Sequence, residues 1–261
     1  MGFSLITGIG HCGTKWLSTI LNRPEQGVRC YHELSYPTTI GLWQDRQKAV
    51  RERGLARNVF PKYWRQIDGD LKRYKFVCDS MSWCSIESVA AAKVGNAEKI
   101  IYLVRNGIQQ LYSAANCSIW LHVSDDHFLY QGFLKTYWEI AGKPYKEWSR
   151  WTRWEKLCLW WETNEFMPQW MTTRFDGVVE TYRLEDLVTP TGRLEKIVSR
   201  YGLTIDGESL HKLQGNDVNR KVPGDRSPSA LWEPWSEKEK EAFLAICTKG
   251  MQRYNYRIMN G

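Results

Sequence analysis

Short apolar runs alternate with glycine-rich and polar stretches along this chain, and the alternation predicts strands and helices in turn. The runs with strand character are residues 3–8, 28–32, 74–78, 99–104 and 178–182. Apolar residues at helical spacing follow in residues 15–22, 85–94, 108–116, 184–201 and 236–254, with a break at Thr189-Pro190 in the fourth of these. Such alternation predicts an α/β fold of three layers, in which helices flank a central parallel sheet of about five strands.

The two ends of the chain carry the clearest local signals. The first strand, a glycine-rich loop and the first helix lead into the strand at residues 28–32, which predicts parallel pairing through a right-handed crossover. Ser236 and Glu239 form a capping box that begins the last helix. Residues 214–235 read as a polar loop.

The length of 261 residues suits one sizeable α/β domain, so we expect residues 1–261 to form a single domain. Two segments, at about 40–70 and 117–175, are rich in aromatic residues and look like helical insertions into that domain. We expect most tryptophans there to pack in the core.

The composition indicates the net charge of the protein and the compartment in which we expect it. The net charge of +7 favours anionic ligands. Seven cysteines, an odd number without a CxxC pair, speak against a complete disulfide framework and against a zinc ribbon. No signal peptide and no apolar run of about 18 residues is visible. We therefore expect a soluble protein of the reducing cytoplasm.

The loop at residues 8–16 has the composition of an anion site. Its three glycines allow tight turns, and the helix behind it offers backbone N–H groups to an anion. Gly8, Gly10 and Gly13 match the GxGxxG pattern of dinucleotide sites, with Glu33 at a suitable distance for a ribose hydroxyl, so an NAD(P)-dependent oxidoreductase is one alternative. A P-loop nucleotide kinase is another, although its Lys-Thr order is inverted here.

The same loop resembles a third pattern. The run HCGTKWL, residues 11–17, is similar to the motif [KR]-x-G-T-[TK]-W-L that sulfotransferases dependent on 3′-phosphoadenosine-5′-phosphosulfate (PAPS) carry after their first strand. The resemblance implies a P-loop-like fold and a 5′-phosphosulfate held by Gly10, His11, Cys12, Gly13, Thr14, Lys15 and Trp16. It also implies that His11 and Lys15 stabilise the bridging oxygen as the P–O–S bond breaks. Since His11 stands where many members have Lys or Arg, we expect Lys15 to supply the permanent charge.

A second motif favours the sulfotransferase reading over the dinucleotide reading. Arg105 and Ser113 follow the strand at 99–104 and resemble the pattern R-[DN]-P-x-[DE]-x-x-x-S, with Gly107 in place of proline. In that family the Arg and Ser bind the 3′-phosphate of the donor. Arg220 and Lys221, in a late polar loop, are further candidates for this phosphate. The segment from Arg183 to Val188 resembles a family segment of architectural role.

The catalytic base is expected at the end of the second predicted strand. His32 and Glu33 are the candidates, and His32 is slightly favoured because imidazole titrates near neutral pH. Asp79 and Ser80 end the third strand and are candidates for substrate binding. No metal is required, because Lys, Arg and backbone N–H groups can neutralise the charge.

The sequence thus predicts a PAPS-dependent sulfotransferase of the EC 2.8.2 type. It would transfer a sulfuryl group by in-line displacement to a hydroxyl or amine of a small-molecule acceptor, with adenosine 3′,5′-bisphosphate as product. The identity of that acceptor is open. We expect neither a nucleic-acid partner, since no reader motif is visible, nor a membrane partner. A homodimer is left open.

Overall fold

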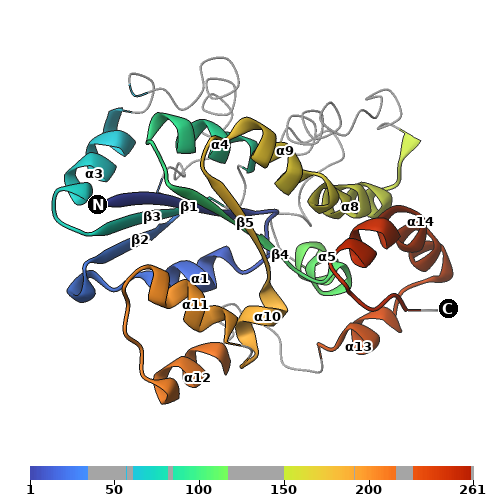
Figure 1. Cartoon of the computed structure of the whole chain (residues 1–261). Coiled ribbons are helices and arrows are strands. Elements are labelled where there is room, and N and C mark those ends of the chain that lie inside the picture. The colour runs from blue at the N-terminus through green and yellow to red at the C-terminus, as the bar shows by residue number, and fades with distance from the viewer. Residues whose placement is uncertain are drawn as a thin grey trace. The chain divides into compact units, whose positions relative to one another are not determined.

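The computed structural model of the chain describes residues 1–34, 57, 61–81, 85–116, 150–190, 192–215 and 226–259 (Figure 1). The chain divides into two compact units. The first joins Met1–Val104 to Met171–Arg220, and the second joins Arg105–Trp170 to Lys221–Gly261. The expectation of a single domain stays a prediction. Of the two aromatic segments, residues 61–70 and 150–175 belong to the described part of the chain.

A parallel sheet of five strands forms the centre of the first unit, as predicted. Its strands are β1 (Gly2–Gly8), β2 (Val28–His32), β3 (Phe76–Met81), β4 (Lys99–Val104) and β5 (Val178–Arg183). They lie in the order β2-β3-β1-β4-β5, and every neighbouring pair is parallel. All seven residues of β1 are buried, as expected for the central strand of a covered sheet.

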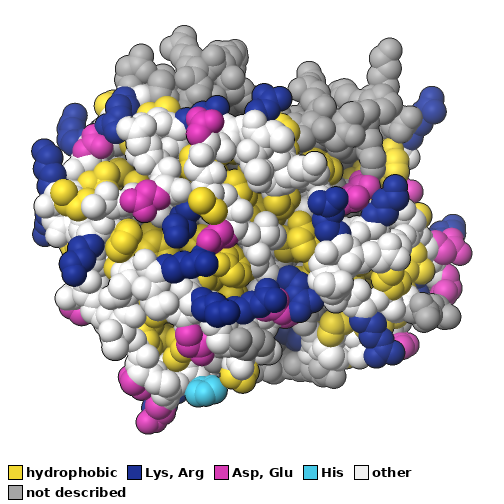
Figure 2. Space-filling view, in the orientation of Figure 1, with side chains coloured by type: hydrophobic (Ala, Val, Ile, Leu, Met, Phe, Trp, Pro, Cys, Tyr) yellow, Lys and Arg dark blue, Asp and Glu magenta, His cyan; other side chains and the backbone are white. Residues whose placement is uncertain are grey.

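Helices cover both faces of this sheet, which confirms the three layers (Figure 1). One face carries α1 (Thr14–Leu21), α10 (Leu184–Val188), α11 (Arg193–Arg200) and α12 (Gly207–Gly215). The opposite face carries α3 (Pro61–Leu71) and α4 (Ser85–Val94). A short turn of 3₁₀ helix, η1 (Pro24–Gln26), connects α1 to β2. Lys62, Arg65, Lys72 and Arg73, in and just after α3, are exposed. Lys and Arg side chains lie along the left side of Figure 2, where Figure 1 shows α3.

The segment after β5 has the architectural character that its sequence suggested. Asp186 is buried and forms ion pairs with Arg183 and Arg193, the second at 2.8 Å. These contacts join the end of β5 to the start of α11.

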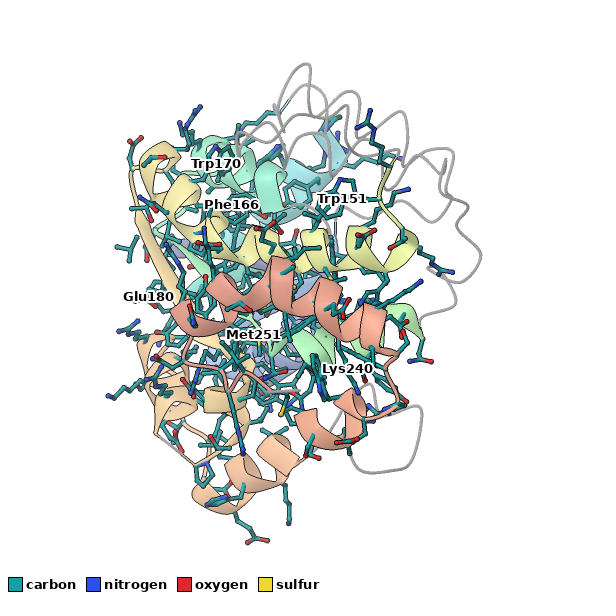
Figure 3. All side chains as sticks on the ribbon, turned by 90° about the vertical axis from the view of Figure 1, so that its right-hand side faces the viewer. Trp151, Phe166, Trp170, Glu180, Lys240 and Met251 are labelled. Atoms are coloured by element: carbon teal, nitrogen blue, oxygen red, sulfur yellow. The ribbon has the colours of Figure 1, made fainter. Side chains whose placement is uncertain are left out.

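The second unit is helical in its described part. It contains α5 (Gly107–Ala115), α8 (Arg153–Glu162), η3 (Thr163–Glu165), α13 (Pro228–Trp232) and α14 (Glu237–Arg253). Helix α9 (Met167–Arg174) crosses the boundary between the two units in the sequence. Figure 3 shows α14 with Lys240 towards its start and Met251 towards its end, and this helix packs on α8.

Aromatic side chains also pack in the core of the second unit. Of the described tryptophans in the aromatic segment at 117–175, Trp160 and Trp161 are buried as expected, whereas Trp151, Trp154 and Trp170 are partly exposed. Trp154, Trp232, Trp235 and Phe243 make edge-on or tilted ring contacts with centroids 4.6–5.6 Å apart. The predicted capping box of Ser236 and Glu239 begins α14. Thr152 and Glu155 form a second capping box, at the start of α8.

The described cysteines are consistent with reduced thiols. All five are free and buried: Cys12, Cys30, Cys78, Cys158 and Cys247. Among the described residues, no helix is both long and apolar enough to span a bilayer. Nor do three or more His, Cys, Asp or Glu side chains in this part of the chain form a group that could hold a metal ion.

Candidate functional site

The candidate residues of the first unit gather at the carboxyl ends of its strands. The glycine-rich loop follows β1, His32 is the last residue of β2, and Asp79 and Ser80 lie near the end of β3. Because β3 lies between β1 and β2, the register places His32 directly opposite Ser80. Parallel α/β sheets bind their ligands just beyond the carboxyl ends of their strands.

The loop between β1 and α1 is bent by residues in the left-handed region. His11 has a φ of 66° and Gly13 a φ of 95°. Such residues help to turn neighbouring N–H groups towards one side, which is how loops build anion-binding concavities. Gly13 is also the N-cap of α1, so no side chain of its own covers the start of this helix.

Close packing holds the loop in place. A Cβ atom at Gly8 would overlap the carbonyl oxygen of Leu103 in β4 and lie 2.5 Å from the Cys12 sulfur. At Gly13 it would lie 2.6 Å from a methyl group of Leu184, at the start of α10. The loop therefore rests directly on its neighbours and needs glycine at both positions.

We expect Gly8→Ala to lower the free energy of unfolding by about 2 kcal/mol, because backbone atoms of β4 cannot move aside as a side chain could. Urea unfolding of the full chain measures this. Gly69→Ala is the matched control, since a Cβ at this glycine of α3 meets nothing within 4 Å. It should stabilise the protein by about 0.5–1 kcal/mol, as alanine does within a helix. A Gly8→Ala protein as stable as the wild type would contradict this, because it would show that the loop can shift to accommodate a methyl group.

The side chains of the loop point in two directions. Cys12 and Trp16 are buried in the core, and the Trp16 indole donates to the carbonyl of Leu213 in α12 at 3.0 Å. These two residues can therefore offer a ligand only their backbone. Thr14 is buried as well, whereas Lys15 is exposed and forms no ion pair within the described part of the chain.

His32 lies between a hydroxyl, a carboxylate and a cation. Its Nδ1 is 3.2 Å from the Ser80 hydroxyl, and its Nε2 is 4.0 Å from a Glu33 carboxylate oxygen. Burial, and to a lesser degree the charge of Lys15, lower the pKa of His32 to about 4. The imidazole is therefore neutral at neutral pH, with 28% of its side chain exposed.

The turn after β2 is tied to β3 by two hydrogen bonds. Glu33 has a φ of 57°, and its N–H donates to the carbonyl of Ser80 at 2.7 Å. The N–H of Leu34 donates to the Asp79 carboxylate at 3.2 Å. Burial, supported by the charge of Glu33, raises the pKa of Asp79 to about 7, while the Leu34 N–H and the Tyr63 hydroxyl oppose the rise.

Asp79 and Ser80 were candidates for direct substrate binding. Both are 0% exposed; the Asp79 carboxylate accepts from the N–H of Leu34, and the Ser80 hydroxyl contacts His32. Their contacts thus support the turn that carries the His32–Glu33 pair. Sequence reasoning could not find this role, because it depends on the pairing of β2 with β3.

Arg105 and Ser113 belong to the second unit. Arg105 precedes α5, its carbonyl accepts a 3.0 Å hydrogen bond from the Trp161 indole, and Ser113 lies on α5 itself. Asn106 caps this helix by accepting from the N–H of Ile108 at 3.0 Å. A Cβ at Gly107 would lie 3.1 Å from Trp161 and from Phe243, so glycine suits this close packing. Arg220 and Lys221 lie outside the described residues.

No protein-family model and no curated protein matches this sequence. Among solved structures, a sulfotransferase from Alicyclobacillus acidocaldarius is similar over 97% of this chain and 96% of its own, with 13% identity and a TM-score of 0.50. The chain has the sulfotransferase fold. Two further sulfotransferase structures are similar to it, each with a TM-score of 0.49. One is the sulfotransferase domain of the Synechococcus PCC 7002 olefin synthase, with 15% identity over 98% of this chain and 95% of that one. The other is a mouse sulfotransferase complexed with PAP, with 13% identity over 97% and 85%.

The strand order of this sulfotransferase fold bears on the dinucleotide alternative. Dinucleotide-binding sheets have the order 3-2-1-4-5-6, in which the acidic residue after the second strand lies beside the glycine loop of the first. Here β3 separates β2 from β1. Glu33 is therefore one strand further from the loop than a ribose-binding carboxylate would be.

Proposed function

We propose that this protein is a PAPS-dependent sulfotransferase acting on a hydroxyl or amine of a small-molecule acceptor. The observation that carries the proposal is the loop after β1. It combines left-handed residues, an uncapped helix start and the exposed Lys15 with the motif HCGTKWL, in a sulfotransferase fold. Lys15, a cation that pairs with no carboxylate among the described residues, suits an anionic phosphosulfate beside such a loop.

Each part of the loop has its task in this proposal. Backbone N–H groups of residues 10–16 and the Lys15 ammonium hold the 5′-phosphosulfate end of the donor. His11 and Lys15 stabilise negative charge on the oxygen that leaves, as preorganised donors do in other enzymes. Arg105 and Ser113, with Arg220 and Lys221, are the proposed partners of the 3′-phosphate, on the strength of their sequence spacing.

The bound donor supplies the sulfuryl group: the acceptor atom bonds to sulfur while the bond from sulfur to the phosphate oxygen breaks, and that oxygen keeps the electron pair. The protein must take the acceptor's proton, and in this proposal the His32–Glu33 pair, which lies at the end of β2, has that task. Ser80 contacts His32 directly, and Asp79 accepts from the N–H of Leu34, the residue after Glu33.

Thermal unfolding with four ligands tests the proposal. Adenosine 3′,5′-bisphosphate should raise the melting temperature, since a ligand at 100 times its Kd stabilises by about 2.7 kcal/mol. NAD, NADP and Mg-ATP at the same concentration should have little effect. Stabilisation by a dinucleotide or by Mg-ATP, with none by the bisphosphate, would overturn the proposal. Transfer of labelled sulfate from PAPS to a panel of phenols, alcohols, sugars and amines would then define the acceptor.

A further inference from the structure

The contact between Ser80 and His32 determines which atom of the His32–Glu33 pair is able to accept a proton. Ser80 Oγ lies 3.2 Å from Nδ1 of His32, and the pairing of β2 with β3 sets the two residues side by side. Ser80 is 0% exposed, so solvent water does not reach its hydroxyl. The imidazole is thus held by its Nδ1 edge.

The direction of this hydrogen bond follows from the burial of the hydroxyl. A serine hydroxyl can donate one hydrogen bond and accept others, and a buried donor that finds no acceptor is costly. Within the described part of the chain, Nδ1 is the one hydrogen-bond partner of Ser80 Oγ. Donation from Ser80 to Nδ1 satisfies the hydroxyl, whereas the reverse direction leaves its proton without an acceptor among the described residues.

Acceptance at Nδ1 fixes the tautomer of the ring. Since burial and Lys15 keep the pKa of His32 near 4, the ring is neutral at neutral pH and carries a single proton. With Nδ1 accepting from Ser80, that proton resides on Nε2. Nε2 faces the Glu33 carboxylate at 4.0 Å, and a negative oxygen on this side favours the same tautomer.

Ser80 also holds the second member of the pair. Its carbonyl oxygen accepts the N–H of Glu33 at 2.7 Å, which fixes the backbone of Glu33 in the left-handed region. The side chain of Glu33 is 18% exposed, so an acceptor can reach its carboxylate. An ionised carboxylate can accept several hydrogen bonds, whereas a protonated Nε2 can accept none.

We propose that Ser80 is a positioning residue that keeps the proton of His32 on Nε2, so that Glu33, not His32, takes the proton of the acceptor. This inference rests on the proposed function for the identity of the reaction, and it reverses the slight preference for His32 that the sequence suggests. In the transfer step the acceptor's O–H or N–H proton passes to a Glu33 carboxylate oxygen. The Nε2–H of His32 faces this carboxylate at 4.0 Å, beyond hydrogen-bond distance, and acts on it through its dipole.

The tautomer can be measured without any substrate. In the full chain labelled with ¹⁵N-histidine, the protonated and unprotonated ring nitrogens have well-separated ¹⁵N chemical shifts, and His32→Gln assigns the signals. The wild type should show the Nε2–H form. Ser80→Ala should shift the ratio of Nε2–H to Nδ1–H by about five- to tenfold towards Nδ1–H, as expected for the loss of one hydrogen bond.

Ser88→Ala is the matched control. Ser88 is a buried serine of α4 whose hydroxyl donates to Thr7 at 3.0 Å, so its removal deletes a similar hydrogen bond elsewhere in the unit. It should leave the His32 tautomer unchanged. A wild-type protein with the proton on Nδ1 would overturn the proposal. The ¹⁵N shifts of the wild type therefore test it even if Ser80→Ala fails to fold.

Kinetics give the second readout. Glu33→Gln should lower kcat by on the order of 100-fold, within the range that general base catalysis contributes, with the Kd for adenosine 3′,5′-bisphosphate unchanged within about twofold. His32→Gln, which keeps an N–H donor, should lower kcat by no more than about tenfold. The opposite ranking of the two variants would overturn the assignment of the base. An Nε2–H tautomer in a protein that neither binds the bisphosphate nor transfers sulfate would instead overturn the proposed function alone.

Discussion

Replacing Asp79 by asparagine is expected to remove a large pH dependence from the stability of this protein. The folded protein raises the pKa of Asp79 to about 7, chiefly by burial, whereas an aspartate in the unfolded chain titrates near pH 4. Between these two values the folded state holds one proton more than the unfolded state. The contribution of Asp79 to stability is therefore complete below about pH 4, falls as the pH rises, and is lost above about pH 7.

The size of the effect follows from the shift. Each pH unit in this window changes the free energy of unfolding by about 1.4 kcal/mol, which gives up to about 4 kcal/mol in total. Asparagine has the same shape and can still accept from the N–H of Leu34. Asp79→Asn should therefore be more stable than the wild type at pH 8 by a margin that disappears, or changes sign, by about pH 4.

Urea unfolding at several pH values between about 4 and 8 measures this difference. Asp176→Asn, at an exposed position of the same unit, is the control and should keep the wild-type pH dependence. If the curves of the wild type and Asp79→Asn ran parallel over this range, the carboxyl would have an ordinary pKa, and the buried site would be more polar than it appears from its 0% exposure.

Lys15→Ala is expected to weaken the binding of adenosine 3′,5′-bisphosphate by about 30- to 100-fold. The ammonium is the exposed cation at the start of α1, and it meets no competing carboxylate among the described residues. Charge-assisted hydrogen bonds to phosphate are worth about 1.5–3 kcal/mol, and each 1.4 kcal/mol corresponds to a factor of ten in Kd. Calorimetric titration of the full chain gives the value directly.

Two comparisons separate this effect from a general loss of positive charge. Lys62→Ala removes an exposed lysine of α3 and should leave the Kd unchanged within about twofold. Added salt should weaken binding more in the wild type than in Lys15→Ala, because the variant has lost a screened interaction. A Lys15→Ala protein with wild-type affinity would place the 5′ end of the ligand elsewhere.

The elements of the sheet and of the helices on it were predicted well where apolar residues in the sequence are also buried in the structure. After Lys99, residues 100–104 form an uninterrupted apolar run, and β4 has the predicted bounds Lys99–Val104. β2 at Val28–His32 and α4 at Ser85–Val94 were likewise confirmed to the residue. In each case the local pattern and the buried environment favour the same element.

The bounds of β3 were predicted only in part. The apolar run indicated a strand at residues 74–78, with Asp79 and Ser80 at its end, whereas β3 runs from Phe76 to Met81. Asp79 and Ser80 continue the strand because they pair with β1 on one side and β2 on the other. Buried polar residues at the end of a strand interrupt the apolar run by which the strand is recognised in the sequence. Here they also contact the turn that carries His32 and Glu33.

Two helices near the end of the chain were missed. α13 lies within the predicted loop of residues 214–235, although Ser227 as N-cap and Pro228 as first helical residue form a recognised start signal. α12 at Gly207–Gly215 has few apolar residues, and the Trp16 indole bound to Leu213 fastens it to α1. That contact joins residues 197 positions apart, so no local pattern could reveal it.

The strand order has a consequence for how the protein is made. β1 is synthesised first, yet its partners in the sheet are β3 and β4, and it does not pair with the next strand, β2. A nascent chain that ends before residue 76 therefore exposes both edges of an apolar strand, a template for aggregation. The loop between β1 and α1 gains its support from Leu103 and Leu184 only when those later segments have left the ribosome. Contacts of such long sequence separation form slowly, so ligand-binding capacity should emerge as one of the last events in folding.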